Sequence, residues 1–183
     1  MAETDVARVV EVFERVGAGW ALVGAHAVGL LTEPRATEDF DFIVEESKLR
    51  LVVEGLRDVF GELDEEDVGA AIRLRALNVD LIRSTNHPLF GEAIAQTHKV
   101  GDWNIPSAEI VVVLKYLSAV SPWRHIDRRA QDIVDLRRVY RQVGRDNLDV
   151  ARMIALAALA YPGAENEFQR ILDLIDRGKP IEV

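Results

Sequence analysis

The spacing of hydrophobic residues changes along the chain and predicts two kinds of secondary structure. Apolar positions repeat every three to four residues in some segments, as in amphipathic helices, and run continuously or alternate in others, as in strands. Helices are predicted over 4–16, 25–31, 48–60, 88–96, 126–142, 147–160 and 164–177, with a further helix starting at Pro106-Ser107. Strands are predicted over 20–23, 38–44, 68–77, 79–82 and 99–105.

Loops, turns and caps separate these segments. Pro34 places 32–35 in a loop, because proline disfavours helix in the residue before it. Ser47 is expected to cap the helix 48–60, and 61–66 is expected to be an acidic turn. The order of elements predicts an α+β fold: a mixed sheet with flanking helices over 1–105, then a C-terminal helical region over 106–183 packed on that core.

Composition narrows the class of protein. The 183 residues are 49% hydrophobic, which fits one globular domain or a domain with a small helical appendage. The absence of cysteine excludes a disulfide framework, a thiolate nucleophile and a Cys-ligated metal. Since there is neither an apolar run of about 20 residues nor a basic, apolar leader, we expect a cytoplasmic protein without a membrane partner. The tryptophans are expected in the core.

The charge is unevenly distributed. A net charge of −9 argues against a general nucleic-acid coat protein, because phosphate contacts need a basic surface. Residues 1–70 hold 17 acidic and 6 basic side chains, whereas 71–183 hold 14 acidic and 16 basic ones. Seven arginines lie within 123–145 against three aspartates. This stretch is either a solvated helix face or a footprint for a phosphate backbone.

Two carboxylates mark the most informative segment. Asp39 and Asp41 are two residues apart in a predicted strand, which places them on one face. Such charges repel unless a cation lies between them, and Mg²⁺ is the usual cation, completing its shell with waters and substrate phosphates. Asp80 lies in the apolar run 79–82, where a carboxylate needs a partner or a metal. The alternatives are a solvated acidic face for the pair and a turn-capping role for Asp80.

A turn upstream of these carboxylates suits an anion. The strand 20–23 passes through Gly24 into a short helix, whose N–H groups can face a phosphate. Arg35 and Thr37 flank the carboxylates and can contact a substrate phosphate. A phosphate-binding turn beside a metal-binding strand is the minimal equipment for phosphoryl transfer. His26, just past the turn, is expected to be a packed or hydrogen-bonded histidine.

The ordered motifs resemble a known family. Gly24-Ala25-x-Ala27, then Arg35-Ala36-Thr37-x-Asp39-x-Asp41, then Asp80, resemble the nucleotidyltransferase fold of the DNA polymerase β superfamily. The branch they most resemble is the AbiEii-type nucleotidyltransferases, many of them toxins of toxin–antitoxin pairs. Downstream, the helix carrying Lys115 and the segment from Arg128-Arg129 to Asp132 resemble that branch's Lys and Arg/Asp motifs. The resemblance covers roughly residues 20–140.

The resemblance implies a role for each matching residue. Asp39, Asp41 and Asp80 would ligate Mg²⁺ or Mn²⁺, and Asp80 would also help to activate the acceptor hydroxyl. Lys115 would reach the nucleotide phosphates, and Asp132 would contact Lys115 or the substrate. The remaining nucleotide-binding positions would be Gly24, Ala25, Arg35 and Thr37. From the residues alone, Lys115 could instead be a lysine with its ammonium in water, and Asp132 a partner of neighbouring arginines.

The implied function is Mg²⁺-dependent transfer of a nucleoside monophosphate from ATP or another NTP to an acceptor hydroxyl. The implied acceptor is tRNA, with protein or a small molecule such as an aminoglycoside left open, and toxin biology would add an antitoxin partner. The chain departs from the superfamily at Ala25, where a serine is commonest and would bond a phosphate oxygen. This departure keeps open a non-catalytic nucleotidyltransferase-like module that binds and regulates, and a metal-dependent hydrolase is a third reading.

Overall fold

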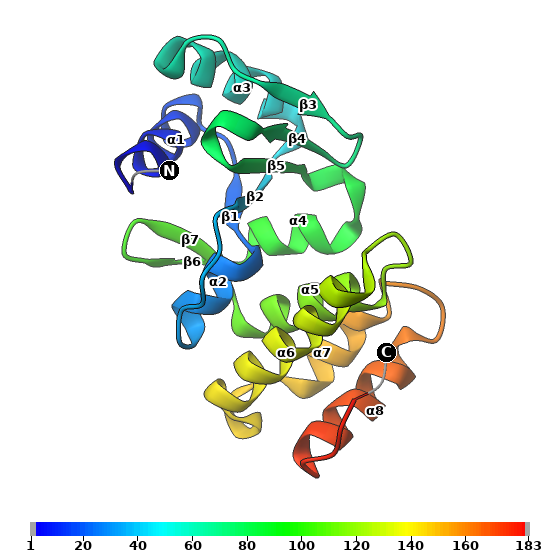
Figure 1. Cartoon of the computed structure of the whole chain (residues 1–183). Coiled ribbons are helices and arrows are strands. Elements are labelled where there is room, and N and C mark those ends of the chain that lie inside the picture. Colours follow the sequence, from blue (N-terminus) through cyan, green and yellow to red (C-terminus); the bar gives the residue numbers. More distant parts are fainter. Residues whose placement is uncertain (1–2, 182–183) are drawn as a thin grey trace. The chain divides into compact units, whose positions relative to one another are not determined.

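The computed structural model describes residues 3–181, which form an α+β fold made of two compact units. The first unit contains residues up to Ala27 together with Arg35–Pro106, and the second contains Val28–Pro34 and the residues from Ser107 onward. Helix α2 (Gly24–Leu31) begins in the first unit and ends in the second. Figure 1 labels the elements of both units. The predicted fold class, a mixed sheet with flanking helices and a helical C-terminal part, is confirmed.

A five-stranded mixed sheet, in the order β1-β2-β5-β4-β3, forms the centre of the first unit. The strands are β1 (Trp20–Leu22), β2 (Phe40–Val44), β3 (Glu65–Asp67), β4 (Ala71–Leu74) and β5 (Val79–Arg83). Strand β5 pairs parallel with β2 and antiparallel with β4, so segments distant in sequence become neighbours at the middle of the sheet. A separate hairpin joins β6 (Thr97–Val100) to β7 (Trp103–Pro106).

Helices α1 (Glu3–Val16) and α3 (Glu46–Phe60) contact each other and lie side by side in Figure 1. Phe13 of α1 packs against Trp20 and Phe42 of the sheet, with ring centroids 5.5 and 5.1 Å away. All three side chains are at least 98% buried, and burial of one large apolar side chain stabilises a fold by roughly 1.5–3 kcal/mol. Helix α4 (Pro88–Ala95) contacts β1, β2 and β7. The apolar pattern of α1 therefore forms the core as predicted.

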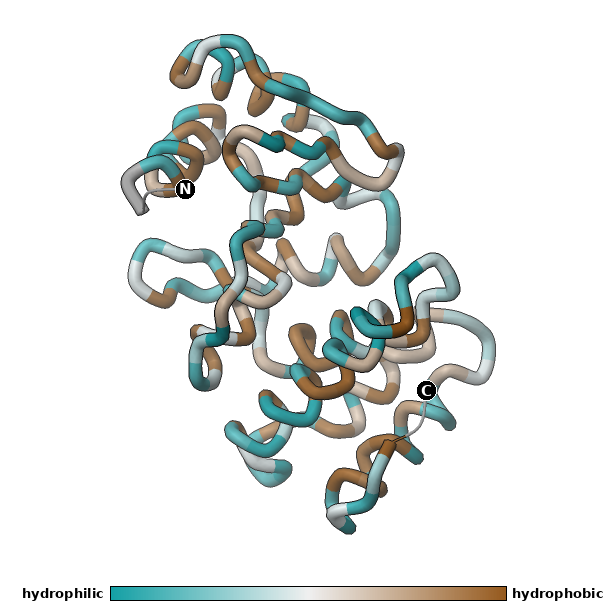
Figure 2. Tube along the Cα trace, viewed as in Figure 1, coloured by the Kyte–Doolittle hydropathy of each residue, from teal (hydrophilic) through white to brown (hydrophobic). Residues whose placement is uncertain are grey.

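The second unit is a group of helices. They are α5 (Ala108–Val120), α6 (Ile126–Val143), α7 (Val150–Ala157) and α8 (Ala164–Asp176). Helix α5 contacts α6 and α7, and it is apolar along most of its length, as Figure 2 shows. Tyr116 of α5 packs against Phe168 of α8, and its hydroxyl donates to the carbonyl of Ala164 at 3.1 Å. None of the helices within 3–181 is long and apolar enough to cross a membrane.

Some predicted strand boundaries are wrong, and each difference has a local cause. Strand β2 begins at Phe40 rather than at residue 38, because the first ladder bond runs from the Phe40 N–H to the Asn78 carbonyl, at 2.8 Å. Residues 65–67, predicted as part of an acidic turn and the residues after it, form β3 because they pair with β4. The segment 99–105, predicted as one strand, instead forms most of the β6–β7 hairpin, which turns at Gly101.

Two helix starts also differ from the prediction. Helix α3 begins one residue before Ser47, so Ser47 lies inside the helix and is not its cap. The helix predicted over 147–160 is shorter, because Asp149 accepts a hydrogen bond from the Arg152 N–H at 2.9 Å and so fixes the start of α7. The other predicted helices agree with the structure to within about two residues, the usual uncertainty of such boundaries.

Candidate active site

Four charged side chains lie in one row across the sheet. Asp41 on β2 is the register partner of Asp80 on β5, Asp80 is the partner of Arg73 on β4, and Arg73 is the partner of Glu66 on β3. Partners in register share one face of a sheet, so the row reads Asp41, Asp80, Arg73, Glu66. The parallel pairing of β2 with β5 therefore brings two of the predicted carboxylates side by side.

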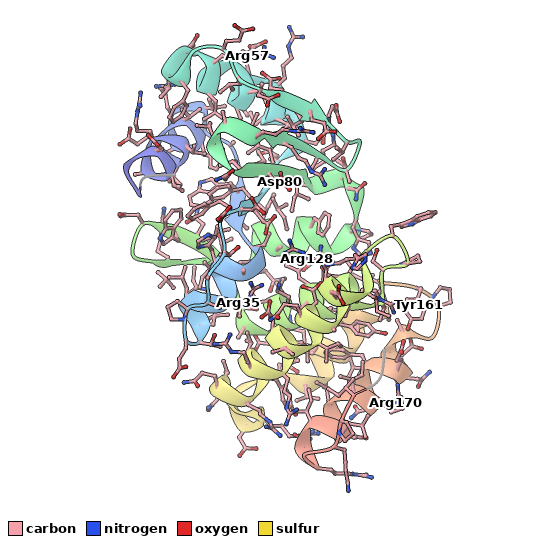
Figure 3. The ribbon with its side chains drawn as sticks, in the orientation of Figure 1. Arg35, Arg57, Asp80, Arg128, Tyr161 and Arg170 are labelled. Carbon is pink, nitrogen blue, oxygen red and sulfur yellow. The ribbon has the colours of Figure 1, made fainter. Side chains whose placement is uncertain are left out.

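The Asp80 carboxylate is poorly compensated in this row. Its Oδ2 atom lies 3.8 Å from Arg73 Nε, and its side chain is 32% exposed. Figure 3 labels Asp80 among the side chains of the sheet unit. Burial raises the pKa of Asp80 above its ordinary value; Arg73 lowers it, and the charges of Asp39 and Glu66 raise it again. Since desolvation and two like charges outweigh one arginine, a further cation beside Asp80 would be stabilising.

Asp39 lies outside β2, whereas the sequence pattern predicted it within that strand, on the same face as Asp41. It is exposed and lies in the loop immediately before β2. Its charge nevertheless acts on Asp80, so it lies in the same neighbourhood. Within residues 3–181, no three Asp, Glu, His or Cys side chains are arranged to hold a metal ion. The structure thus brings Asp41 and Asp80 together and leaves Asp39 beside them on a loop.

The Asp41 carboxylate lies against the turn that begins α2. Gly24 has a φ of +65°, which favours glycine, and a Cβ placed on it would come 1.9 Å from Asp41 Oδ2. The backbone of the same turn is tied to β2, since the Val23 N–H donates to the Asp41 carbonyl at 2.9 Å. The start of a helix carries partial positive charge, which stabilises an adjacent carboxylate. The predicted phosphate turn and one predicted carboxylate are therefore in direct proximity.

His26 belongs to the same neighbourhood. Its ring stacks on Phe40 with centroids 3.7 Å apart and planes inclined by 8°. Burial is the main cause that lowers the pKa of His26; Arg35 lowers it further and Asp39 raises it, so both charges lie near the ring. Ala25 is buried, and Arg35 donates to the carbonyl of Ala36 at 3.5 Å.

Lys115 and Asp132 form a buried ionic cluster in the second unit. Lys115 Nζ lies 3.0 Å from Asp132 Oδ1 and 2.8 Å from Asp135 Oδ2, and the side chains of all three are at least 92% buried. Arg124 Nε lies 2.5 Å from Asp132 Oδ2, so two cations balance two carboxylates. The expected contact between Asp132 and Lys115 is present. A lysine with its ammonium in water, the alternative reading, is wrong.

Several side chains of the arginine-rich stretch form hydrogen bonds or ion pairs within the chain. Arg138 donates to the Glu33 carbonyl at 2.7 Å, Arg141 donates to the Ile175 carbonyl at 3.2 Å, and Arg145 pairs with Asp176. Arg128, labelled in Figure 3, is exposed at the start of α6. Trp123, expected in the core, is 95% exposed in the loop before α6.

Sequence reasoning missed two charged partners. Arg73 becomes a site residue only because β4 pairs with β5, which alternation within 71–74 cannot reveal. Asp135 is the second carboxylate on Lys115, and its spacing from Asp132, three residues along one helix, was the available signal.

The donor set of the sheet unit fits a hard divalent cation. Mg²⁺ is commonly held by one or two carboxylates, with waters and substrate phosphates completing its octahedron. Asp41 and Asp80 supply two carboxylates from adjacent strands, and because burial raises the pKa of Asp80, a nearby cation would stabilise its charged form. A helix start next to them offers N–H groups to an anion. The arrangement can therefore hold a cation and a phosphate in one place.

Solved structures with a similar fold include an antibiotic-resistance factor and a nucleotidyltransferase-like protein, whereas no family model and no curated protein matches the chain. The antibiotic-resistance factor ANT(2'')-Ia superposes with a TM-score of 0.56 at 11% identity, over 96% of this chain and 95% of that one. An antigenic nucleotidyltransferase-like protein from Paracoccidioides brasiliensis has a TM-score of 0.50 at 16% identity, over 97% and 93%. This chain has a nucleotidyltransferase-like α+β fold.

Proposed function

We propose that the chain is a divalent-metal-dependent nucleotidyltransferase that moves a nucleoside monophosphate from an NTP to an acceptor hydroxyl. The observation that carries the proposal is the register pair of Asp41 and Asp80 beside the Gly24 turn. Two adjacent carboxylates need a cation, and the helix start needs an anion. A metal–NTP complex meets both needs, and the nucleotidyltransferase fold supports the same chemistry.

Each site residue of the sheet unit has its own role in this proposal. Asp41 and Asp80, with Asp39 beside them, would hold Mg²⁺ or Mn²⁺, which stabilises negative charge on phosphate oxygens when bound. The first N–H groups of α2, after Gly24 and including that of Ala25, would donate to the triphosphate. Arg35 and Thr37 would contact its outer oxygens. Asp80 would also help to activate the acceptor hydroxyl.

Lys115 and Asp132 enter the proposal through the family resemblance. The Lys115 ammonium is bound by Asp132 and Asp135, so a nucleotide phosphate would have to compete with two carboxylates for it. Asp132 would then set the position of Lys115. A variant at Lys115 that raises the KM for NTP without unfolding the protein would support this role.

A labelling screen tests the transfer reaction. Purified protein with Mg²⁺ or Mn²⁺ is given each α-³²P-NTP with tRNA, protein, an aminoglycoside or buffer alone. Asp39→Asn/Asp41→Asn is the inactive control, and Glu62→Gln/Asp64→Asn, in the loop between α3 and β3, is the matched change of two acidic residues. Label in one acceptor, lost only in the first variant, supports the proposal and identifies the nucleotide and the acceptor.

The same screen separates the competing functions. Pyrophosphate release without a labelled acceptor would indicate the hydrolase. No label, together with NTP-dependent thermal stabilisation, would favour the binding module, for which Ala25 is the supporting feature. A toxin role, with a cytoplasmic target and an antitoxin partner, predicts growth arrest on expression that Asp39→Asn/Asp41→Asn abolishes.

A further inference from the structure

One ring nitrogen of His26, in the candidate site, has no hydrogen-bond partner within residues 3–181. Its Nε2 atom is buried and has no hydrogen-bond partner in the part of the chain that the structure describes. A buried polar atom without a partner costs free energy, so such an atom in a native fold needs an explanation. The other two buried side-chain atoms of this kind, Ser107 Oγ and Arg152 Nη2, belong to the helical unit, whereas His26 lies at the Gly24 turn.

The position of His26 favours an anionic partner. The residue lies two positions after Gly24, in the first turn of α2, where backbone N–H groups have no acceptor within the helix. The Arg35 charge acts on the same ring. A helix start and a guanidinium near the imidazole both favour an anion, and the charge of Asp39 opposes it.

The ring is held in a defined place relative to the carboxylates. Its stack on Phe40 has a centroid separation of 3.7 Å, and Phe40 is the residue between Asp39 and Asp41. A side chain fixed against this residue does not lose much rotamer freedom when a ligand binds, so its hydrogen bond contributes more to affinity. Ala25, the residue after Gly24, has no hydroxyl to offer a phosphate, and His26 is the next side chain with an N–H donor.

We propose that His26 is a nucleotide-positioning residue whose Nε2 donates a hydrogen bond to a phosphate oxygen of the bound NTP, in place of the hydroxyl that Ala25 lacks. The inference rests on the proposed function and specifies how the turn holds the triphosphate. It assigns recognition of the phosphates, not of the base, to this side chain.

The test compares His26→Phe, which keeps an aromatic ring on Phe40, with His26→Gln, which keeps an N–H donor. The probes are tripolyphosphate and the four nucleosides, each titrated by calorimetry in the presence of Mg²⁺. His26→Phe is expected to weaken tripolyphosphate binding roughly ten-fold or more, since hydrogen bonds to charged groups are the strong class. Nucleoside binding is expected to stay unchanged, and His26→Gln is expected to recover part of the loss. His98→Phe, on exposed β6, is the matched control.

Kinetics add a second readout. In the labelling reaction His26→Phe should raise the KM for NTP more than it lowers kcat, because the contact binds the ground state as well as the transition state. Equal tripolyphosphate affinity in wild type and a folded His26→Phe would overturn the inference. So would a parallel loss for tripolyphosphate and nucleosides, which would indicate a purely structural stack. A wild type that binds NTP but transfers no label would overturn the proposed transfer while leaving the phosphate contact supported.

Discussion

Substituting Gly24 by alanine tests whether the turn and the Asp41 carboxylate form one site. The added Cβ would meet Asp41 Oδ2 at 1.9 Å and Asp41 Cγ at 2.8 Å, distances that real Cβ contacts do not reach. The carboxylate must therefore leave its position against the start of α2. Gly17→Ala is a matched control, because Gly17 has nearly the same φ, +66° against +65°, and nothing within 4 Å of its added Cβ.

The two variants share one energetic cost and differ in another. A non-glycine residue in the left-handed region costs about 1–2 kcal/mol, and both variants bear it. Only Gly24→Ala also has to displace a packed side chain, which adds about 1–3 kcal/mol. Gly17→Ala should therefore lose about 1–2 kcal/mol of unfolding free energy, and Gly24→Ala about 2–5 kcal/mol.

Urea unfolding gives both stabilities, and thermal shift with Mg²⁺ and NTP gives ligand-dependent stabilisation. Gly24→Ala should lose that stabilisation and the labelling activity, whereas Gly17→Ala should keep both. Equal destabilisation by the two variants, with ligand effects retained in each, would refute the packing of Asp41 against Gly24 as the basis of the site.

Three further predictions concern charge and hydrogen bonding. Asp80→Asn should raise the Tm in EDTA near neutral pH. Because the pKa of Asp80 is raised, its favourable contribution to stability exists below its ordinary pKa and is lost as pH rises through the raised value. The Tm gain should therefore vanish near pH 3, below the ordinary pKa of about 3.9, and a gain that persists there would contradict this account. Lys115→Met should cost about 3–5 kcal/mol in urea unfolding by leaving buried carboxylates without their lysine. Lys99→Met, at a 58% exposed lysine, should cost less than about 1 kcal/mol, and equal losses would argue against the buried cluster. Tyr116→Phe should lose about 1–3 kcal/mol, because the hydroxyl bonds Tyr161 and Ala164. Burial raises the pKa of Tyr116, so the stability difference between wild type and Tyr116→Phe should stay constant from neutral pH up to the ordinary tyrosine pKa of about 10. A stability difference that already falls near neutral pH would contradict this role of the hydroxyl.

Local sequence pattern was sufficient for most elements of this fold. The three-to-four-residue spacing over 4–16 corresponds to α1, and the apolar run after Gly19 corresponds to the buried strand β1. Such patterns are informative because one face of each element must be buried, and the residues of that face are close together in the sequence. Strand β3 was missed because its residues are acidic, and only backbone pairing with β4, whose Arg73 forms an ion pair with Glu66, makes them a strand.

In the candidate site, too, local sequence predicts some features and misses others. Sequence alone proposed Gly24, Asp41 and Asp80 for one site, since a carboxylate in an apolar run is costly without a partner, and the structure brings these three residues close together. It placed Asp39 on the wrong structural element, because alternation by itself does not fix where a strand begins.

What the sequence by itself determined is therefore most of the elements and the set of residues proposed to bind metal and phosphate. The tertiary structure decided which of those residues meet. Asp41 and Asp80 became neighbours through the parallel pairing of β2 and β5, and Arg73 joined them through β4. Lys115 acquired two carboxylates through the packing of α5 on α6. Contacts of this kind depend on strand register and helix packing over long sequence separations, which no local periodicity encodes.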